Sequence, residues 1–395
     1  MRTVIVQYAG DYREAVRRIN AAGEETYYAQ RHSVDAVAAL ATGNDSVIVI
    51  CCLTDAPYDE CLENGVRAIG AGFSAPFDGR RLIPLVAPQN PDRLIVRTPA
   101  KHLLRWAASQ SFRTLAVFAD SFTFGGLRGR IRAYQWKTLL NEKRIEFVLN
   151  HGLNSCLSLR KIGVDPDKVI PWDWPAMVTP DAHAKLQPKT ECFEILFVGL
   201  VTEAKGIGDA IRAIAELKRR GMNVRLRVVG GGEVETFAAL AKTLHVDDRV
   251  GFSGLLGHDA VLAHMRDAAV VVVPSHHDYA EGFPMTIYET LCSRTPLVAS
   301  DHPMFRGNLT HDVDSWIFPA GDANALAEGL CGLLSNEDRY RRLSAASVDT
   351  WVRLQLPVKW AEAMERWVSD SADDRNWFRE RRLSSGIYPL QRYET

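Results

Sequence analysis

The segment Pro274–Leu291, PSHHDYAEGFPMTIYETL, combines a glycine, a proline and carboxylates in a way that suits the binding of an anion. Gly282 allows the backbone to approach a ligand closely, and Pro284 fits the first turn of a helix, where its missing N–H is not needed. We therefore expect a helix to begin near Pro284, with its free N–H groups and its positive dipole end facing a phosphate or sugar hydroxyls. These N–H groups belong to Phe283, Met285 and Thr286.

Two glutamates accompany this predicted helix. Glu281 stands at the mouth of the loop, and Glu289 lies on the helix with seven residues between them. A carboxylate on the helix can accept two hydrogen bonds from vicinal hydroxyls such as those of a ribose. In the alternative interpretation, Glu281 complements the helix dipole and Glu289 is a solvated surface charge.

Two further loops follow strand-like runs in the same half of the chain. The first, 199–206, carries Lys205, whose compact charge could lie against a diphosphate or be an ordinary surface charge. The second, 230–233, does not spell the dinucleotide fingerprint G-x-G-x-x-G, and the first does not spell it either. A nicotinamide-dependent dehydrogenase is therefore disfavoured.

Taken together, these loops resemble those of the retaining glycosyltransferases of family 4, which have the GT-B architecture. The resemblance covers roughly residues 192–335 and rests on several stretches that occur in the expected order. They are FVGLVTEAKG, RVVGGGE, GFSG, EGFPMTIYE with its two glutamates, and SRTPLVAS. The first half of the chain matches only in layout.

The resemblance implies a role for each matched residue. Glu281 would orient the hydroxyls of the donor sugar, and Glu289 would bind the ribose of the nucleotide. Lys205 and the loop amides would neutralise the departing diphosphate, so that no metal or other cofactor is expected. The resemblance thus assigns catalysis to Glu281 and Lys205, and donor binding to Gly199, Lys205, Leu255 and Leu256 near the base, Gly282, Phe283, Pro284, Met285, Thr286 and Glu289.

Two positions differ from many members of that family. Leu200 follows Gly199 where an arginine often clamps the diphosphate, and Ala119-Asp120 stands where a histidine is common. Asp120 could contact the acceptor, or it could cap a helix or belong to a hinge. His151 is a further candidate on the acceptor side.

His276 and His277 precede Glu281 in the same loop, and histidine can donate, accept or bind a metal. No second ligand stands at a metal-like spacing from them or from His151 in the sequence. We therefore interpret all three as histidines with ordinary hydrogen-bond partners, and expect no metal site.

Residues 128–144 contain six basic side chains and one acidic side chain, interleaved with apolar ones. Such a stretch could press on an anionic membrane surface, bind the phosphate of an acceptor, or be a solvated helix face. The pattern recurs more weakly near the C-terminus, at Arg375, Trp377, Phe378, Arg379, Arg381 and Arg382.

Aliphatic runs alternate with amphipathic stretches, which predicts strand–helix units and parallel sheets covered on both faces. In the first half the strands are expected at 4–6, 47–52, 94–96 and 115–118, and the helical stretches at 12–22, 58–69, 100–110 and 131–140. In the second half the strands are expected at 193–198, 224–229, 250–253, 270–273 and 297–299, and helices at about 206–219 and 323–334.

The alternation of aliphatic and amphipathic stretches stops between these two series, in the segment 171–192, which holds four prolines. We therefore predict a GT-B α/β fold of two doubly wound Rossmann-like domains that face each other across a cleft. Its parts are an N-terminal acceptor-side domain at 1–170, a proline-rich connector at 171–191, a nucleotide-sugar domain at 192–350, and a helical C-terminal tail at 351–395 that packs back on the first domain.

The 395 residues include 47 basic and 48 acidic side chains, and a formal charge of −1 gives no reason to expect nucleic acid as a partner. Seven cysteines without zinc-type spacing indicate reduced thiols. We find no secretory signal, and no apolar run approaches the roughly 18 residues of a membrane span. The expected location is the cytoplasm, with peripheral contact at the inner face of the membrane as an option.

These features together predict an enzyme that transfers a sugar from a nucleoside diphosphate sugar, of the UDP or GDP type, to a hydroxyl with retention of anomeric configuration. The acceptor would be a glycan, a lipid-linked oligosaccharide or a small molecule. One alternative is a sugar-nucleotide epimerase or phosphorylase of the same architecture, which would form its product from the donor alone. Another is a non-catalytic partner subunit, which Leu200 and Ala119-Asp120 favour, whereas Lys205, Glu281 and Glu289 disfavour it.

Overall fold

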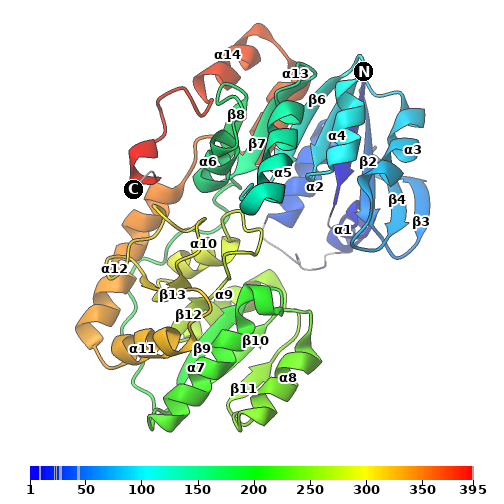
Figure 1. The fold of residues 1–395 in the computed structure, drawn as a ribbon. Coiled ribbons are helices and arrows are strands. Elements are labelled where there is room, and N and C mark those ends of the chain that lie inside the picture. The colour runs from blue at the N-terminus through cyan, green and yellow to red at the C-terminus, as the bar shows by residue number, and fades with distance from the viewer. Residues whose placement is uncertain (9, 22, 24, 26–28, 42–44, 394–395) are drawn as a thin grey trace. The chain divides into compact units, whose positions relative to one another are not determined.

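The computed structural model describes residues 1–393 except 9, 22, 24, 26–28 and 42–44. Residue 22 of the first predicted helix and residues 394–395 of the predicted tail lie outside the described residues. The chain forms two compact units (Figure 1). Unit 1 contains Met1–Glu25, Ala29–Pro175 and Leu356–Leu390, and unit 2 contains Ala176–Gln355 and the residues from Gln391 onward.

Unit 1 is built on an eight-stranded sheet. Its strands are β1 (Arg2–Gln7), β2 (Ser46–Leu53), β3 (Pro57–Cys61), β4 (Arg67–Phe73), β5 (Arg93–Arg97), β6 (Arg113–Phe118), β7 (Ile145–His151) and β8 (Val169–Trp172). The order β3-β4-β2-β1-β5-β6-β7-β8 places the switch point between β1 and β5. Neighbouring strands pair in parallel except β3 and β4.

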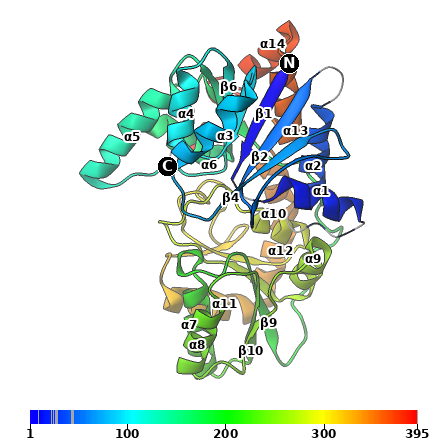
Figure 2. The same cartoon turned by 90° about the vertical axis from the view of Figure 1, so that its right-hand side faces the viewer.

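Helices cover both faces of this sheet. They are α1 (Tyr12–Asn20), α2 (Gln30–Ala39), α3 (Ile83–Val86), α4 (Lys101–Ala108), α5 (Gly126–Leu140), α6 (Leu153–Lys161), α13 (Trp360–Ser369) and α14 (Ala372–Glu380), with the short 3-10 helices η1 (Gly79–Leu82) and η2 (Ala87–Gln89). Figure 2 shows α2 and α13 on one side of the sheet and α4 and α5 on the other. Because helices cover both faces of the sheet, its inner strands are buried on both sides and consist mostly of aliphatic residues.

The stretch 58–69, predicted as helical, is instead an antiparallel hairpin of β3 and β4. Its connection contains Asn64-Gly65, a pair that favours hairpin turns, and Gly65 has a φ of +82°, which glycine adopts without strain. The prediction of a purely parallel sheet is therefore wrong at this edge. An edge strand that faces water on one side carries polar residues, so it lacks the aliphatic run that marks its neighbours.

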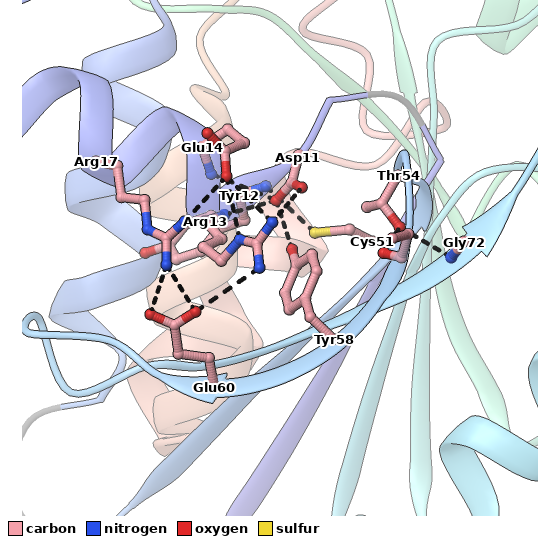
Figure 3. Close-up of polar contacts among 11 residues, drawn as sticks. Asp11, Tyr12, Arg13, Glu14, Arg17, Cys51, Thr54, Tyr58, Glu60 and Gly72 are labelled. Atoms are coloured by element: carbon pink, nitrogen blue, oxygen red, sulfur yellow. Dashed lines mark hydrogen bonds and ion pairs between the residues drawn. The ribbon is translucent and has the colours of Figure 1, made fainter.

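Polar side chains hold this hairpin on α1 (Figure 3). The Tyr58 hydroxyl donates to the carboxylate of Asp11, which also caps the N-terminus of α1. Glu60 pairs with Arg17 at 2.9 Å, and the guanidinium of Arg13 lies 3.6 Å from the centre of the Tyr58 ring. These contacts to α1 hold the hairpin on unit 1 in addition to the pairing of β4 with β2.

The C-terminal helices α13 and α14 pack into the core of unit 1. Trp360 and Trp367 of α13 and Trp377 of α14 are buried in the same apolar cluster as Ile5 and Val49 of the central strands. Unit 1 is therefore completed by residues that follow unit 2 in the sequence.

Unit 2 is built on a six-stranded parallel sheet. Its strands are β9 (Phe193–Val198), β10 (Val224–Val229), β11 (Val250–Phe252), β12 (Val270–Val273), β13 (Leu297–Ser300) and β14 (Trp316–Phe318). Its helices are η3 (Glu203–Lys205), α7 (Ile207–Arg219), α8 (Val234–Thr243), α9 (His258–Asp267), α10 (Met285–Cys292), α11 (Ala323–Leu334) and α12 (Glu337–Leu354), and a last turn, η4 (Leu390–Tyr393), ends the described chain. The predicted strands and helices of this half are confirmed to within about a residue.

The strand order β11-β10-β9-β12-β13-β14 is the order 3-2-1-4-5-6 of the doubly wound Rossmann fold. The direction of winding changes between β9 and β12. Proteins with such sheets bind ligands beyond the carboxyl ends of the strands at this switch point, so the site of unit 2 is expected beyond the ends of β9 and β12.

Two boundaries differ from the predicted ones. β8 continues to Trp172, so the first residues of the predicted connector belong to a strand of unit 1. α12 continues unbroken to Leu354, so the last segment of unit 1 begins at Leu356 and not at 351. Pro357 stands three residues after the end of α12, and because the residue before a proline, here Leu356, avoids helical backbone, the helix cannot continue far beyond Leu354.

The loops at the switch point of unit 2 touch through their backbones. Gly206 has a φ of +75°, and a Cβ added to it would stand 2.1 Å from the carbonyl oxygen of Pro274. A Cβ at Gly230, where φ is +144°, would stand 1.8 Å from the carbonyl oxygen of Gly199. Because no side chain fits at either place, glycine allows the loops after β9, β10 and β12 to converge.

Replacement of Gly206 by alanine should destabilise unit 2 more than the same change at Gly221. Both glycines have a left-handed φ, +75° and +79°. Both variants should therefore lose about 1 kcal/mol through backbone strain. A Cβ at Gly221 meets no described atom within 4 Å, whereas one at Gly206 must displace the Pro274 carbonyl, which should cost about 1–3 kcal/mol more. We expect the thermal midpoint of G206A to lie a few degrees below that of G221A, and equal midpoints would contradict the backbone contact.

Candidate active site

The carboxyl ends of β9 and β12 carry the two loops that hold the candidate donor residues. The first begins at Gly199 and contains Lys205, and the second comprises residues 274–284. A hydrogen bond of 2.9 Å from the His276 N–H to the Ala204 carbonyl joins them. The loops therefore form one continuous surface at the switch point.

Glu281 and Lys205 meet on this surface. The Lys205 ammonium forms an ion pair with the Glu281 carboxylate, and Glu281 is only 6% exposed. The Ser275 hydroxyl donates to the same carboxylate oxygen at 2.8 Å, and Lys205 Nζ lies 4.4 Å from the centre of the Tyr279 ring. A cation and a hydroxyl thus fix the carboxylate, and an aromatic ring lies close to the ammonium.

Glu289 lies on α10 with its side chain buried, so the interpretation as a solvated surface charge is wrong. Its Oε1 lies 3.3 Å from Nδ1 of His258, the first residue of α9. A carboxylate has about four lone-pair positions, so this contact leaves Glu289 able to accept hydrogen bonds from hydroxyl groups.

α10 begins one residue after Pro284, close to the predicted start. Pro284 occupies the N-cap position, and no side chain caps the helix. The N–H groups of the first turn, together with the positive end of the helix dipole, therefore suit an anion. The ring of Phe283 is buried against Tyr288 and Phe305, so this residue anchors the loop through its side chain.

The other candidate donor residues lie at the same edge of the sheet. Gly199 directly follows β9, and the Thr286 hydroxyl lies 3.5 Å from the carbonyl of Val198 at the end of that strand. Leu255 follows β11 and is 83% exposed, which suits an apolar contact with a ligand. Leu256 is partly buried and packs against an apolar cluster of unit 2.

His276 has partners that the sequence did not indicate. Its Nε2 lies 2.6 Å from Oδ2 of Asp209, and Glu203 lies beside them, so that the three offer ligand atoms within 4.8 Å of one another. The expectation that no second ligand accompanies the histidines is therefore wrong for His276, because Asp209 is 67 residues away in the sequence. Nη1 of Arg212 pairs with both carboxylates, at 3.3 and 3.2 Å, and balances their charge.

A second candidate site lies at the switch point of unit 1, beyond the carboxyl ends of β1, β5 and β6. A cavity of about 810 Å³ is located there, and Tyr8, Lys101 and Asp120 help to line it. Gln7 and Arg97, the last residues of β1 and β5, also line it and are joined by a hydrogen bond of 3.0 Å. The cavity therefore offers donors, acceptors and charges of both signs to a polar substrate.

Asp120 follows β6 at this cavity. Its backbone N–H and carbonyl are bonded to the side chain of Asn150, at 3.2 and 2.8 Å. Burial raises the pKa of the Asp120 carboxyl group to about 6. The next helix, α5, has Gly125 at its N-cap, so the interpretation of Asp120 as a helix cap is wrong.

His151 ends β7 and is not among the residues that line the cavity. It is buried, its Nε2 lies 3.2 Å from Oδ1 of Asp173, and its ring packs against Trp172. The structure therefore does not bring His151 to Asp120 at the acceptor cavity. In unit 2, Nε2 of His277 lies 2.7 Å from Oδ1 of Asp301.

Sequence reasoning missed several residues of both sites. Ser275 and Tyr279 stand in the same loop as Glu281, and only the fold shows that they contact the Glu281–Lys205 pair. Gln7 and Arg97 could have been found, because each is a polar residue that ends an aliphatic strand at the switch point.

The second half of the chain is similar to known glycosyltransferases. Residues 178–349 match the family model described as Glycosyl transferases group 1. Over 189 residues the chain is 28% identical to the amylovoran biosynthesis glycosyltransferase AmsK of Erwinia amylovora, covering 46% of this chain and 42% of that one. Over 171 residues it is 30% identical to the phosphatidyl-myo-inositol mannosyltransferase of Mycobacterium leprae, covering 43% and 45%. The chain thus spans less than half the length of these curated relatives.

The likeness to solved structures extends over most of the chain. A sucrose-phosphate synthase from Thermosynechococcus elongatus has a TM-score of 0.70 at 19% identity, covering 93% of this chain and 98% of that one. Anabaena Alr3699/HepE in complex with UDP and glucose has a TM-score of 0.65 at 13% identity, covering 90% and 95%. The chain therefore has the GT-B α/β fold of these solved structures, and residues 178–349 match the Glycosyl transferases group 1 family.

Proposed function

We propose that this chain is a glycosyltransferase that moves a sugar from a nucleoside diphosphate sugar to an acceptor hydroxyl with retention of anomeric configuration. The observation that carries the proposal is the ion pair of Lys205 and Glu281 beside the uncapped N-terminus of α10. The match of residues 178–349 to a glycosyltransferase family and the names of the relatives support it.

The donor diphosphate would lie between Lys205 and the first N–H groups of α10. As phosphate oxygens approach, Lys205 can exchange part of its pairing with Glu281 for them, which frees Glu281 oxygens for the hydroxyls of the sugar. Glu289 would hold the ribose, and Leu255 would lie against the base. A UDP or GDP donor is supported by one similar structure that contains UDP and glucose, and by a Mycobacterium tuberculosis relative named as GDP-mannose-dependent.

During transfer, the bond between the anomeric carbon and the phosphate oxygen breaks, and a bond to the acceptor oxygen forms on the same face of the sugar. The proton of the acceptor hydroxyl goes to the leaving phosphate, so a carboxylate base on the opposite face is not required. Lys205 and the helix-end amides would stabilise the charge that develops on the phosphate, and we propose that no metal or cofactor takes part.

The acceptor would bind in the cavity of unit 1. Asp120 can accept a hydrogen bond from a hydroxyl group, and Arg97 and Lys101 supply donors on the same cavity wall. A glycan, a lipid-linked oligosaccharide or a small molecule with hydroxyl groups suits this chemistry.

We propose a cytoplasmic location in which α5 makes peripheral contact with the inner face of the membrane. Three exposed apolar side chains stand at helical spacing on α5: Leu127 (76% exposed), Ile131 (55%) and Tyr134 (67%). Arg128 and Arg132 are exposed beside them, and Figure 2 shows α5 projecting from unit 1. Exposed apolar residues flanked by cations suit an anionic lipid surface. None of the helices in the described part of the chain has the length and apolar character that a membrane span requires.

Sugar transfer should depend on both members of the ion pair, and donor binding mainly on Lys205. Thermal unfolding against a panel of nucleoside diphosphates and their sugars would first identify the donor, since a ligand at about 100 times its Kd adds roughly 2.7 kcal/mol of stability. We expect Glu281→Gln to lower sugar transfer by about 100-fold or more. Lys205→Met should weaken nucleotide binding by about 10-fold, through loss of a charged hydrogen bond. Glu235→Gln, a change of an exposed glutamate on α8, is the matched control.

Three outcomes would contradict this function. The absence of any selective shift in midpoint would favour a non-catalytic subunit. Product formed from the donor alone would favour an epimerase or phosphorylase. A product with inverted anomeric configuration, read by NMR, would exclude retention.

Asp120 should make stability depend on pH. Its pKa is raised, so its neutral form contributes stability that is fully present below pH 3.8 and is lost as pH rises through about 6. Because Asp120→Asn cannot ionise, its advantage over the parent protein should grow by about 1–2 kcal/mol between pH 4 and pH 7, allowing for partial exposure. Urea unfolding at both pH values measures this, with the exposed Asp55→Asn as control. An advantage that does not change with pH would refute the raised pKa.

Membrane contact should require the apolar residues of α5. We expect the triple variant L127S/I131S/Y134S to lose most of its co-sedimentation with vesicles of phosphatidylcholine and phosphatidylglycerol. The control M177S/L186S/I387S removes three other exposed apolar side chains and should sediment as the parent protein does. Equal sedimentation of the two variants would exclude α5 as the contact.

A further inference from the structure

The amino ends of β6 and β7 border a second cavity in unit 1, of about 550 Å³. It is lined by seven basic and three acidic side chains around the aromatic rings of Phe147, Trp367 and Phe378. The chain as a whole has a formal charge of −1, so this positive surplus is local. The candidate acceptor cavity lies at the opposite, carboxyl ends of the strands, which makes the two cavities separate.

The acidic side chains of this cavity are already engaged. Glu146 and Asp370 both pair with Arg113, at 2.8 and 3.0 Å. The third, Asp167, lies 3.6 Å from Arg382. These carboxylates therefore balance arginines, and two further arginines of the cavity are also paired: Arg375 with Asp370 at 3.2 Å, and Arg366 with Glu362 and Asp374 at 2.9 and 3.0 Å. Within the described part of the chain, only some of the seven cations that line the cavity therefore lack a close counter-ion.

Three of those cations, Lys143, Lys168 and Arg379, have no carboxylate oxygen within 4.0 Å among the residues that the structure describes. Lys168 Nζ donates to the carbonyl of Glu142 at 2.7 Å, and Arg379 donates to the side chain of Asn376 at 3.1 Å. Burial lowers the pKa of Lys168 to about 8, and the neighbouring carboxylates offset this only in part. An ammonium that has lost water without gaining a close counter-ion is stabilised by any anion that reaches it.

The floor of the cavity is rigid. Phe147 of β7 and Phe378 of α14 stack with their centroids 4.7 Å apart and their planes at 15°. Trp367 of α13 donates its indole N–H to Glu146 at 2.9 Å. Because these rings are fixed by packing, the aromatic part of the cavity is preformed, and a ligand would have little of it to order.

We propose that this cavity, with Lys143, Lys168 and Arg379, is a binding site for a phosphate-bearing anion. The ligand is distinct from the sugar donor and from the acceptor, because the site lies at the other edge of the sheet in unit 1. Phosphate oxygens offer an acceptor to each of the three cations, and the volume suits one or two phosphates with a small attached group. A soluble phosphorylated molecule and a phospholipid headgroup share this chemistry.

Inorganic pyrophosphate, titrated by calorimetry into the full-length protein, tests the site. The cavity variant K143A/K168A/R379A is compared with the control K161A/K189A/K242A, which removes the same charge from exposed lysines elsewhere. Pyrophosphate bound at the donor site contributes equally to both variants. We expect the cavity variant to bind pyrophosphate at least about 10-fold more weakly than the control, and Lys143→Ala alone, at the exposed rim, to lose several-fold. Equal binding by the two triple variants would overturn the proposal.

Vesicles of phosphatidylcholine and phosphatidylglycerol distinguish the two sources of phosphate. Both triple variants keep α5 intact. If only the cavity variant loses pyrophosphate but sediments with vesicles as the control does, the ligand is a soluble phosphorylated molecule. If it loses both, the ligand is a lipid headgroup. The midpoints of thermal unfolding of both variants establish that they are folded in each measurement.

Discussion

Contacts between main chains shape the candidate donor site of unit 2. The carbonyl of Pro274 occupies the place where a side chain at position 206 would stand, and the carbonyl of Gly199 does the same at position 230. These contacts draw the ends of neighbouring strands together. A lysine from one loop can then share a buried ion pair with a glutamate from the next, so the chemistry depends on glycines as much as on charged residues.

The parts of the fold that could be predicted from the sequence are those in which burial on both faces leaves an uninterrupted aliphatic run. β12, Val270–Val273, is such a strand and was placed to the residue. The hairpin of β3 and β4 could not be predicted in this way, because β3 is an edge strand with polar residues at Asp59 and Glu60. Its turn, Asn64-Gly65, is the one local signal that pointed to it, and the amphipathic pattern around it concealed that signal.

The candidate donor residues were recognisable because Glu281 and Glu289 lie within one short segment. Their partners were not, because contacts such as that of Glu289 with His258 join residues that lie far apart in the chain. At the candidate acceptor site, too, the surroundings of the key residue could not be predicted from the sequence. Asp120 was a candidate only by position, whereas the desolvation that changes its acidity comes from the tertiary packing around the end of β6.

The route of the chain has a consequence for how the protein is made. Unit 2 consists almost entirely of one uninterrupted segment, whereas unit 1 needs Trp360, Trp367 and Trp377 from the end of the chain to fill its core. During synthesis from the N-terminus, the main segment of the second unit, Ala176–Gln355, is therefore available before the last segment of the first unit is made. Until these tryptophans are synthesised, part of one face of the N-terminal sheet stays uncovered. A premature stop before residue 360 would leave that face uncovered permanently.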